Sequence, residues 1–405
     1  MGVAEENALP LAGVRVLDAA TYIAAPVAAA ILAEFGAEVI KIEKPGIGDP
    51  LRRFGAPSGR PDATLFWMNE SRNKRGITLD LGKPEGAELF KRMAAQADVV
   101  CENFRPGTFE RWGLGYDVLS AINPGLVLLR ISAYGQTGPW SGKIGFARMA
   151  HALSGVGYLA GEPDGAPVNP GPSSLADYVC AVYGALGVTL ALRERDNSGK
   201  GQVIDLSLVE AMFRSLDQTL PNYKMHGHVR ERTGSQTPAA APNRNFPTGG
   251  GGWVSLSCTN DKMFQRLCQA MEQPELAQDP RYALSNDRIA NRDEVEGITQ
   301  AWTTSMPREA VVEACDKFEV PCAPILSIAD ICAHPQFLAR DMFVALQDEL
   351  AGEVVLPGVV PKLSRTPGEV KTLGPDMGQD NDTIYRDLLD LSEDEIAGLR
   401  ERAVI

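Results

Sequence analysis

GVRVLDAATYIAAPVAAAILAEFGAEVIKIEKP, residues 13–45, is the stretch of this 405-residue sequence that decides the fold. A β-rich run over 13–18 precedes an alanine-rich helical stretch, and a second apolar run follows over 38–43. Pro26 stands where a helix tolerates proline, in its first turn. A strand, a helix and a strand within about 30 residues form a βαβ unit, whose two strands lie parallel in one sheet.

The same alternation continues along the chain. Parallel strands that alternate with helices build a doubly wound, Rossmann-like sheet. No Gly-x-Gly-x-x-Gly follows the first strand, so the usual dinucleotide-binding fingerprint is missing. Further strands are predicted at 76–80, 97–101, 126–132 and 202–207, with helices at 84–96 and 116–122.

A change of composition after residue 220 indicates a second domain. Residues 222–250 are polar and rich in proline and glycine, and a predicted strand at 253–257 follows them. Amphipathic helices are predicted at about 260–273, 292–305 and 307–318. We therefore predict an α/β fold with a large domain over 1–220, a smaller α+β domain over 225–330, and a return to the large domain over 340–405.

Composition restricts the class of function. Apolar residues make up 44% and charged residues 22% of the sequence, as in ordinary soluble enzymes. The formal net charge of −13 argues against general nucleic-acid binding, which needs a basic surplus. No apolar run was expected to reach the ~18–20 residues of a membrane span. We expect neither nucleic acid nor a membrane as a partner.

Cysteine and histidine usage favours a cytoplasmic protein without a metal. The seven cysteines are widely spread and include no Cys-x-x-Cys pair, which suits reduced thiols. His226 and His228 are the one close pair among four histidines, and they stand in a polar stretch. We therefore expect a cytoplasmic location and no metal site.

Asp177 is the only charged residue between Gly165 and Leu192. Ser174 and Asp177 have the spacing of a capping box, so one interpretation is a structural acid at a helix start. The same geometry would keep the carboxylate ionised and present it at an element end, as a nucleophilic carboxylate requires. These residues alone leave both interpretations open.

Basic residues are enriched around the early predicted strands, although the chain as a whole is acidic. The carboxyl ends of parallel strands meet at one crevice, where cations would hold a polyanion such as the phosphates of a nucleotide. A solvated surface with acidic partners is the alternative. The residues are Lys44, Arg52, Arg53, Arg72, Lys74, Arg75, Arg105 and Arg111.

Gly249, Gly250, Gly251 and Gly252 form an uninterrupted run of glycines. Such a run is most often a flexible turn. It can also be a mobile flap over an active site, where its backbone amides approach a reacting centre.

Several motifs follow one another in a characteristic order: LAGVRVLDAA, AEFGAEVIKIEKPGIGDPLRR, NKRGITLDL, CENFRPGTFERWGLGY, YGQTGPW, GKGQVIDLSLVEAM and VPCAPILSIADICAHPQFLARDMF. From about residue 10 to the end, the chain resembles the class III CoA-transferases, typified by formyl-CoA transferase and carnitine CoA-transferases. The resemblance implies an enzyme that moves CoA between an acyl-CoA and a carboxylic acid. Coenzyme A is then a substrate moiety, and no permanently bound cofactor is expected.

The resemblance also implies roles for particular residues. Asp177 matches the catalytic aspartate, which forms an aspartyl anhydride and then an aspartyl-CoA thioester. Gly249–Gly252 matches a loop that shields this aspartate. The residues implied to contact CoA are Lys44, Arg72, Asn73, Lys74, Arg75, Asn103, Phe104 and Arg111.

Departures from the family pattern bear on the substrate. Formyl-CoA transferase has Val-Gln where this chain has Tyr22 and Ile23, and an acid where this chain has Ala147. Formate and oxalate are therefore not the expected acids. The surrounding segment resembles branches that use succinyl-CoA with dicarboxylates such as malate, citramalate or benzylsuccinate. The predicted substrate contacts are Tyr22, Ile23, Arg148, His151 and Tyr178.

Two alternatives accompany this prediction. The related α-methylacyl-CoA racemases carry a catalytic histidine where this chain has Phe146, and racemisation needs two bases. The other alternative is a non-catalytic subunit of a heteromeric transferase, against which the intact Asp177 argues. We expect either a homodimer or a heterodimer with a sister subunit. The long connections at 213–250 and 330–365 fit the interlocked dimer that the resemblance implies.

Overall fold

The structure, a computed structural model, describes residues 9–405, which divide into two compact units. The first unit comprises residues 9–157, 169–222 and 339–405, and the second comprises 158–168 and 223–338. No pattern in the sequence indicated that the short segment 158–168 packs with the second unit.

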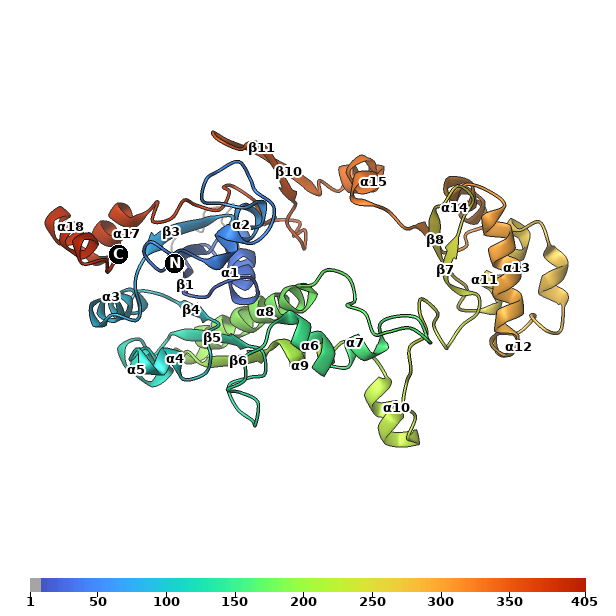
Figure 1. Ribbon diagram of the computed structural model, residues 1–405, viewed down its shortest axis with the longest axis horizontal. Coiled ribbons are helices and arrows are strands. Elements are labelled where there is room, and N and C mark those ends of the chain that lie inside the picture. Colours follow the sequence, from blue (N-terminus) through green and yellow to red (C-terminus); the bar gives the residue numbers. More distant parts are fainter. Residues whose placement is uncertain (1–8) are drawn as a thin grey trace. The chain divides into compact units, whose positions relative to one another are not determined.

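A six-stranded sheet, in which every neighbouring pair of strands is parallel, forms the centre of the first unit (Figure 1). The predicted α/β architecture with a parallel sheet is therefore confirmed. The order of strands reverses direction between β1 and β4. The order is β3 (Lys74–Thr78), β2 (Glu38–Glu43), β1 (Arg15–Asp18), β4 (Val99–Glu102), β5 (Val127–Ser132) and β6 (Val203–Ser207).

Helices cover both faces of this sheet, because successive strand residues point alternately to two separate apolar cores. One core includes residues of α1 (Ala24–Glu34), α2 (Leu65–Glu70), α6 (Ala147–Leu153), α8 (Leu175–Ser198) and α9 (Leu208–Phe213). The other includes residues of α3 (Pro84–Ala94), α4 (Thr108–Arg111), α5 (Tyr116–Ile122), α17 (Asn381–Leu389) and α18 (Glu393–Glu401). The first unit also contains η1 (Pro50–Arg53) and the hairpin of β10 (Phe343–Asp348) and β11 (Gly352–Pro357).

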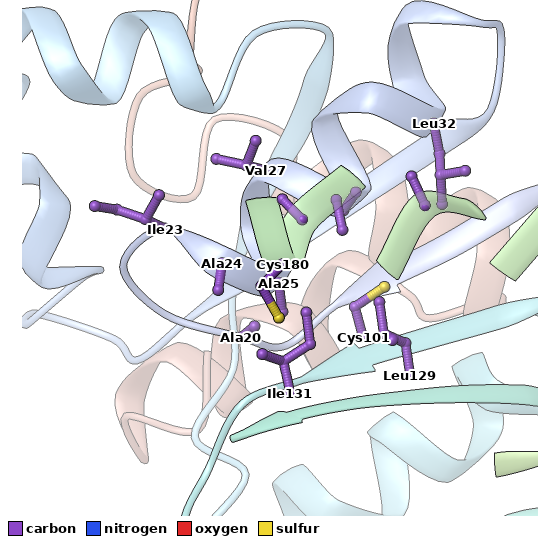
Figure 2. Packing of buried hydrophobic residues seen from close by; sticks show 14 of the residues in the cluster. Ala20, Ile23, Ala24, Ala25, Val27, Leu32, Cys101, Leu129, Ile131 and Cys180 are labelled. Carbon is purple, nitrogen blue, oxygen red and sulfur yellow. The ribbon is translucent and has the colours of Figure 1, made fainter. Parts of the chain in front are cut away.

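Helix α8 packs closely on α1 and on the sheet. A Cβ atom at Gly184 would lie 3.2 Å from the side chain of Ala28 and 3.3 Å from that of Ile131, so glycine permits this approach. Figure 2 shows Cys180, one turn after Asp177, beside Ala25 and Ile131 in the core. The first turn of α8 is thus seated against the apolar core.

The length of α8 corrects one expectation. This helix is long and apolar enough to cross a membrane by length and composition alone, whereas the sequence pattern predicts no such run. Nearly half of its most apolar window, 44%, is buried inside the protein. One face of the helix packs on α1 and the sheet, while Val182, Leu186 and Leu190 of the same helix are exposed.

Strand β3 begins earlier than predicted. It runs over Lys74–Thr78 instead of 76–80, and Lys74 pairs in register with Val39 of β2. Lys74 and Arg75 therefore belong to the amino end of a strand. The expected polar loop is part of the sheet because its neighbour β2 supplies the backbone hydrogen bonds.

The second unit has its own apolar core and a three-stranded antiparallel sheet. The strands are β7 (Asn243–Pro247), β8 (Trp253–Ser257) and β9 (Cys322–Pro324). The helices of this unit are α11 (Asp261–Ala270), η2 (Pro274–Gln278), α12 (Ser285–Ala290), α13 (Arg292–Thr304), α14 (Arg308–Lys317) and α15 (Ile328–Ala333). Helices α10 (Thr219–His226) and α16 (Pro335–Ala339) each include residues of both units. The short helix α7 (Val156–Leu159) lies at the junction with the first unit.

Candidate active site

Asp177 lies in the first turn of α8 and lines a cavity of about 340 Å³. The other walls are residues 21–24 after β1, 103–106 after β4, 131–133 at the end of β5, Ser141, 143–146 and Leu208. Strands β1 and β4 flank the point where the strand order reverses. Open α/β sheets bind their ligands outside the carboxyl ends of the strands at this switch point.

The capping box predicted for Ser174 and Asp177 is not formed. Ser174 precedes the first residue of α8, but its side chain makes no capping hydrogen bond. Its backbone is at φ −96° and ψ 12°, not in the extended conformation from which a serine hydroxyl usually caps a helix. Asp177 therefore has no capping role in holding the start of the helix.

Burial raises the pKa of Asp177 from 3.8 to about 7. Within residues 9–405, no group donates a hydrogen bond to this carboxylate or forms an ion pair with it, so nothing offsets its desolvation. This result is opposite to the expectation that the helix start keeps the acid ionised. An isolated carboxylate with a raised pKa in a cleft is a functional-site candidate, because a purely structural acid would carry partners.

Four hydrogen bonds, made by three side chains, hold the loop between β1 and α1 at this cavity. The side chain of Asn103 binds both backbone groups of Thr21, at 2.8 Å from its N–H and 2.6 Å from its carbonyl oxygen. Asp49 accepts the N–H of Tyr22 at 3.1 Å, and buried Lys41 donates to the carbonyl of Ala20. Tyr22 is held at φ 62°, a left-handed conformation that is uncommon for an aromatic residue.

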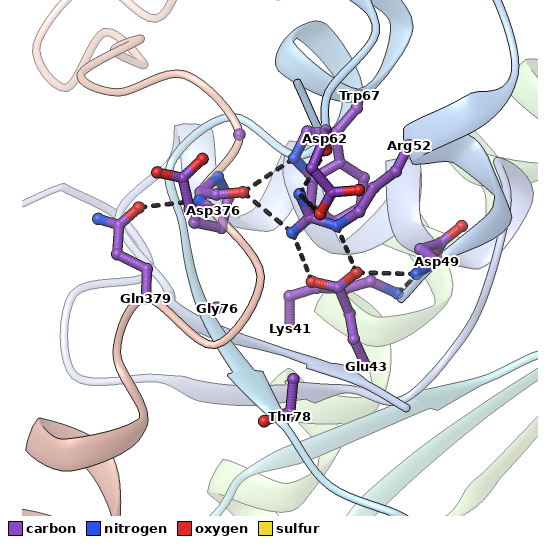
Figure 3. Close-up of polar contacts among 12 residues, drawn as sticks. Lys41, Glu43, Asp49, Arg52, Asp62, Trp67, Gly76, Thr78, Asp376 and Gln379 are labelled. Carbon is purple, nitrogen blue, oxygen red and sulfur yellow. Dashed lines mark hydrogen bonds and ion pairs between the residues drawn. The ribbon is translucent and has the colours of Figure 1, made fainter. Parts of the chain in front are cut away.

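A buried ion-pair network anchors this loop in turn (Figure 3). Lys41 lies 2.9 Å from Asp49, and Arg52 binds Glu43 through two nitrogens at 2.6 and 2.7 Å. Glu43 also accepts the backbone N–H of Asp49 at 2.8 Å. Because each charge is buried and paired, the network fixes the position of Asp49 and hence of the loop.

A second cavity of about 390 Å³ lies at the ends of β2 and β3 and shares Thr21 and Phe104 with the first. Lys44 lines it with a half-exposed side chain, 3.4 Å from the carboxylate of Asp80. Phe104 packs edge-on against Trp112, with ring centroids 4.9 Å apart. Two adjoining cavities of this kind suit an elongated ligand.

Sequence reasoning placed further CoA contacts at Arg72, Lys74 and Arg75, which the structure does not bring to either cavity. Arg72 is paired with Glu34, and Lys74 is buried with its Nζ 2.9 Å from Asp18 and 2.7 Å from the carbonyl of Pro26. Arg75 pairs with Glu38 and Asp380. All three residues lie at the amino end of β3, and there each side chain forms an ion pair with an acid of the protein itself. The neighbouring Asn73 likewise binds backbone groups of residues 369–372.

The remaining predicted residues are divided between the cavities, the surface and the core. Tyr22 and Ile23 line the cavity of Asp177, and Asn103 and Phe104 do so as well. Arg111 is exposed and bonds to Thr108, and Arg148 is exposed on α6. His151 and Tyr178 do not line the cavity; they bond to the backbone N–H of Ala176 and to Glu70, respectively.

The four glycines lie in the second unit and connect β7 to β8. Gly250 and Gly251 have φ of 80° and 86°, so this hairpin connection requires residues without a Cβ. A Cβ at Gly249 would lie 2.9 Å from the carbonyl oxygen of Met306. The local backbone therefore explains why glycine occupies these positions.

Some cavity residues were missed as site candidates. Lys143 and Phe146 line the cavity of Asp177, where the ring of Phe146 packs edge-on against Tyr22 at 6.1 Å. Arg105, noted earlier only as one of the basic residues, also lines this cavity and donates to the carbonyl of Gly142 at 2.6 Å. A basic residue within the glycine-rich stretch 135–145 was the signal that could have indicated Lys143.

No cluster of three or more histidine, cysteine, aspartate or glutamate side chains able to hold a metal ion occurs within residues 9–405. The seven cysteines are free thiols, of which five are buried.

Comparison with known families identifies the class to which this fold and site belong. Residues 11–381 match CoA-transferase family III, and the chain belongs to this family. It is a CoA-transferase, so the predicted enzyme class is confirmed, and coenzyme A is a moiety of its substrates.

Several curated relatives are similar over nearly the whole chain. The succinyl-CoA–L-malate CoA-transferase alpha subunit of Chloroflexus aurantiacus is 49% identical over 404 residues, covering 100% of this chain and 94% of the relative. The succinyl-CoA–L-malate CoA-transferase beta subunit of Chloroflexus aurantiacus is 50% identical over 399 residues, covering 98% of this chain and 98% of the relative. The succinyl-CoA–D-citramalate CoA-transferase of the same organism is 42% identical, again covering 98% of each chain.

A solved structure supports the fold. The crystal structure of a CaiB/BaiF family protein from Brucella suis superposes with a TM-score of 0.84 at 33% sequence identity. The match covers 94% of this chain and 100% of that chain.

Proposed function

We propose that this enzyme transfers CoA from succinyl-CoA to a dicarboxylic acid of the malate or citramalate type, with Asp177 as the covalent nucleophile. The observation that carries the proposal is the unpartnered carboxylate of Asp177 in a cavity at the switch point of the sheet. The choice of acids rests on the names of relatives that are 42–50% identical over nearly the whole chain.

The proposed reaction proceeds through two kinds of acyl-enzyme. Asp177 attacks the thioester carbonyl of the donor and expels CoA thiolate, which leaves a mixed anhydride. The thiolate then attacks the aspartyl carbonyl and expels the donor acid, which leaves an aspartyl-CoA thioester. The acceptor carboxylate attacks that thioester and expels the thiolate, which finally attacks the acceptor carbonyl and frees Asp177. The energy of the thioester is conserved if water is excluded.

Oxyanions form at each step, and backbone amides can stabilise them. The amino end of α1 borders the cavity at Ile23 and Ala24, and no side chain caps this helix. Its unpaired N–H groups and its dipole favour a negative charge there. We further propose that Gly249–Gly252 acts as a flap over the site, as the family resemblance implies; the positive φ of Gly250 and Gly251 shows that this turn favours residues without a Cβ.

For CoA itself we propose the two adjoining cavities. Lys44 borders one cavity, and Arg105 and Lys143 border the other, so phosphate groups would meet cations at both. Exposed Arg111 is retained as a further candidate for a phosphate contact. Tyr22 and Ile23 would meet the acyl group beside Asp177. No permanently bound cofactor is needed for the proposed steps.

We also propose that the chain works in the cytoplasm as an interlocked dimer, either with a second copy or with a sister subunit. Relatives named as alpha and beta subunits support the second form. Interlocked chains separate only on unfolding, so sedimentation at nanomolar concentration should detect the dimer. A freely reversible monomer under native conditions would contradict interlocking.

A CoA-exchange assay tests the function. The chain is expressed alone and purified, and succinyl-CoA is offered with malate, citramalate, benzylsuccinate, glutarate, oxalate and formate while the new thioesters are separated by chromatography. We expect exchange with the hydroxydicarboxylates and little with formate or oxalate. Exchange of an α-proton of an acyl-CoA with solvent deuterium, without CoA transfer, would instead indicate racemisation and refute the proposal.

A further inference from the structure

Among the described residues 9–405 Asp177 has no hydrogen-bond or ion-pair partner, but the residues on either side of it are both anchored. The backbone N–H of Ala176 donates to Nε2 of His151 at 3.2 Å. The hydroxyl of Tyr178 donates to Oε1 of Glu70 at 2.6 Å. The first turn of α8 is thus tied to α6 on one side and to the end of α2 on the other.

His151 performs the capping role that Ser174 leaves open. The first N–H groups of a helix have no partner within the helix, and an acceptor from elsewhere stabilises them. The imidazole is almost completely buried, with 1% of its surface exposed. Because Nε2 accepts this hydrogen bond, the ring is neutral and its proton is on Nδ1. Burial and the nearby Arg148 lower the pKa of His151, which favours this neutral form.

Stability alone does not explain a histidine at this position. Its Nδ1 is buried and finds no hydrogen-bond partner within residues 9–405. A buried polar group without a partner destabilises the fold, so an apolar side chain would be favoured if only packing mattered. The bond from Nε2 to the turn that carries Asp177 is a reason to retain the histidine.

Tyr178 is held from the opposite side by a buried acid. Glu70, with 5% of its surface exposed, accepts both the Tyr178 hydroxyl and the side-chain amide of Asn69 at 2.6 Å. Burial, followed by the proximity of Glu70, raises the pKa of Tyr178, so its hydroxyl remains a donor. Neither Tyr178 nor Glu70 lines the cavity of Asp177.

We propose that His151 and Tyr178 are positioning residues that clamp the first turn of α8 and leave the carboxylate of Asp177 free to react. This inference rests on the proposed role of Asp177, and it replaces the substrate contacts expected of the two residues from sequence. A clamp of this kind affects how the nucleophile is held and leaves the affinity for substrates unchanged.

The test compares matched variants by steady-state kinetics with succinyl-CoA and the best acceptor acid. His151→Leu removes the acceptor, and we expect kcat to fall by about 10- to 100-fold, since a misplaced reacting group costs this much. His151→Gln offers an amide oxygen in place of Nε2 and should recover most of the lost kcat. Tyr178→Phe should lower kcat by about tenfold, with KM for both substrates within about threefold of the parent enzyme.

Ser174→Ala serves as the matched control, because the side chain of Ser174 makes no capping bond, and it should leave kcat unchanged. A large rise in the KM of an acid at unchanged kcat would mean substrate contact and overturn the clamp. Unchanged kinetics in His151→Leu and Tyr178→Phe, or no recovery in His151→Gln, would overturn it too. If His151→Leu fails to fold, the kinetics of His151→Gln and Tyr178→Phe decide the question.

Failure of the clamp and failure of the proposed function give different results. The function fails if the parent enzyme exchanges no CoA or if Asp177→Asn remains active. The clamp alone fails if the parent enzyme is active and Asp177→Asn is inactive, but His151→Leu and Tyr178→Phe have unchanged kinetics or raise only KM, or His151→Gln recovers no activity.

Discussion

Replacing Asp177 by asparagine should abolish CoA transfer and stabilise the protein at neutral pH. The folded-state pKa of Asp177 is raised from 3.8 to about 7, about three units, and each unit corresponds to about 1.4 kcal/mol. The charged form therefore costs the folded state up to about 4 kcal/mol, and asparagine is free of this cost. Transfer should fall at least ~10³-fold, because the covalent nucleophile is lost.

The pH dependence has a definite sign. Between pH 4 and 7 the unfolded chain has released the proton of Asp177 and the folded protein has not, so the stability of the parent protein falls as the pH rises through this window. Urea unfolding of both proteins at pH 4.5, 6 and 8 measures the difference, which should grow towards pH 7 and then level off. An asparagine variant that is less stable than the parent at pH 8, or that still transfers CoA, would refute this reasoning.

Further predictions concern the loop, the ligand and the intermediate. Asp49→Ala should destabilise the protein by ~3–5 kcal/mol in urea unfolding, since it strips buried Lys41 of its closest acid; a loss below about 1 kcal/mol would contradict the network. Lys44→Ala should raise KM for succinyl-CoA several-fold at unchanged kcat, and an unchanged KM would remove Lys44 from the CoA site. The kcat/KM of the parent enzyme should fall about tenfold per pH unit below pH 7, because protonated Asp177 is not nucleophilic, and a flat profile would argue against that pKa. Hydroxylamine added during turnover should modify Asp177 in peptide mass spectra, and modification at another carboxylate instead would identify a different nucleophile.

Much of the secondary structure of the first unit can be predicted from local sequence patterns. The alternation of β-rich runs and helices predicted five of the six parallel strands close to their observed positions, and β3 alone is shifted towards Lys74. The isolation of Asp177 between Gly165 and Leu192 drew attention to it, and the family resemblance then singled it out as the candidate nucleophile. A lone acid at a helix start is a pattern of neighbouring residues, and such patterns are available before the chain folds.

The partners of charged residues could not be predicted from the sequence. Arg72, Lys74 and Arg75 were assigned to CoA, yet they pair with acids up to 305 residues away along the chain. Lys143 was not considered as a site residue, although it lines the cavity of Asp177. A charged residue can be solvated, paired or bound to a ligand, and its sequence neighbours do not distinguish these states.

The sequence by itself therefore determined the parallel α/β architecture and the family, because both are encoded in the order and spacing of nearby residues, and the family resemblance then indicated the candidate nucleophile. Only the tertiary structure decided that Ser174 does not cap α8, that His151 and Glu70 hold the turn on either side of Asp177, and that burial raises the pKa of Asp177. These properties depend on groups 25 to 108 residues apart in the chain, which become neighbours only when the helices pack on the sheet.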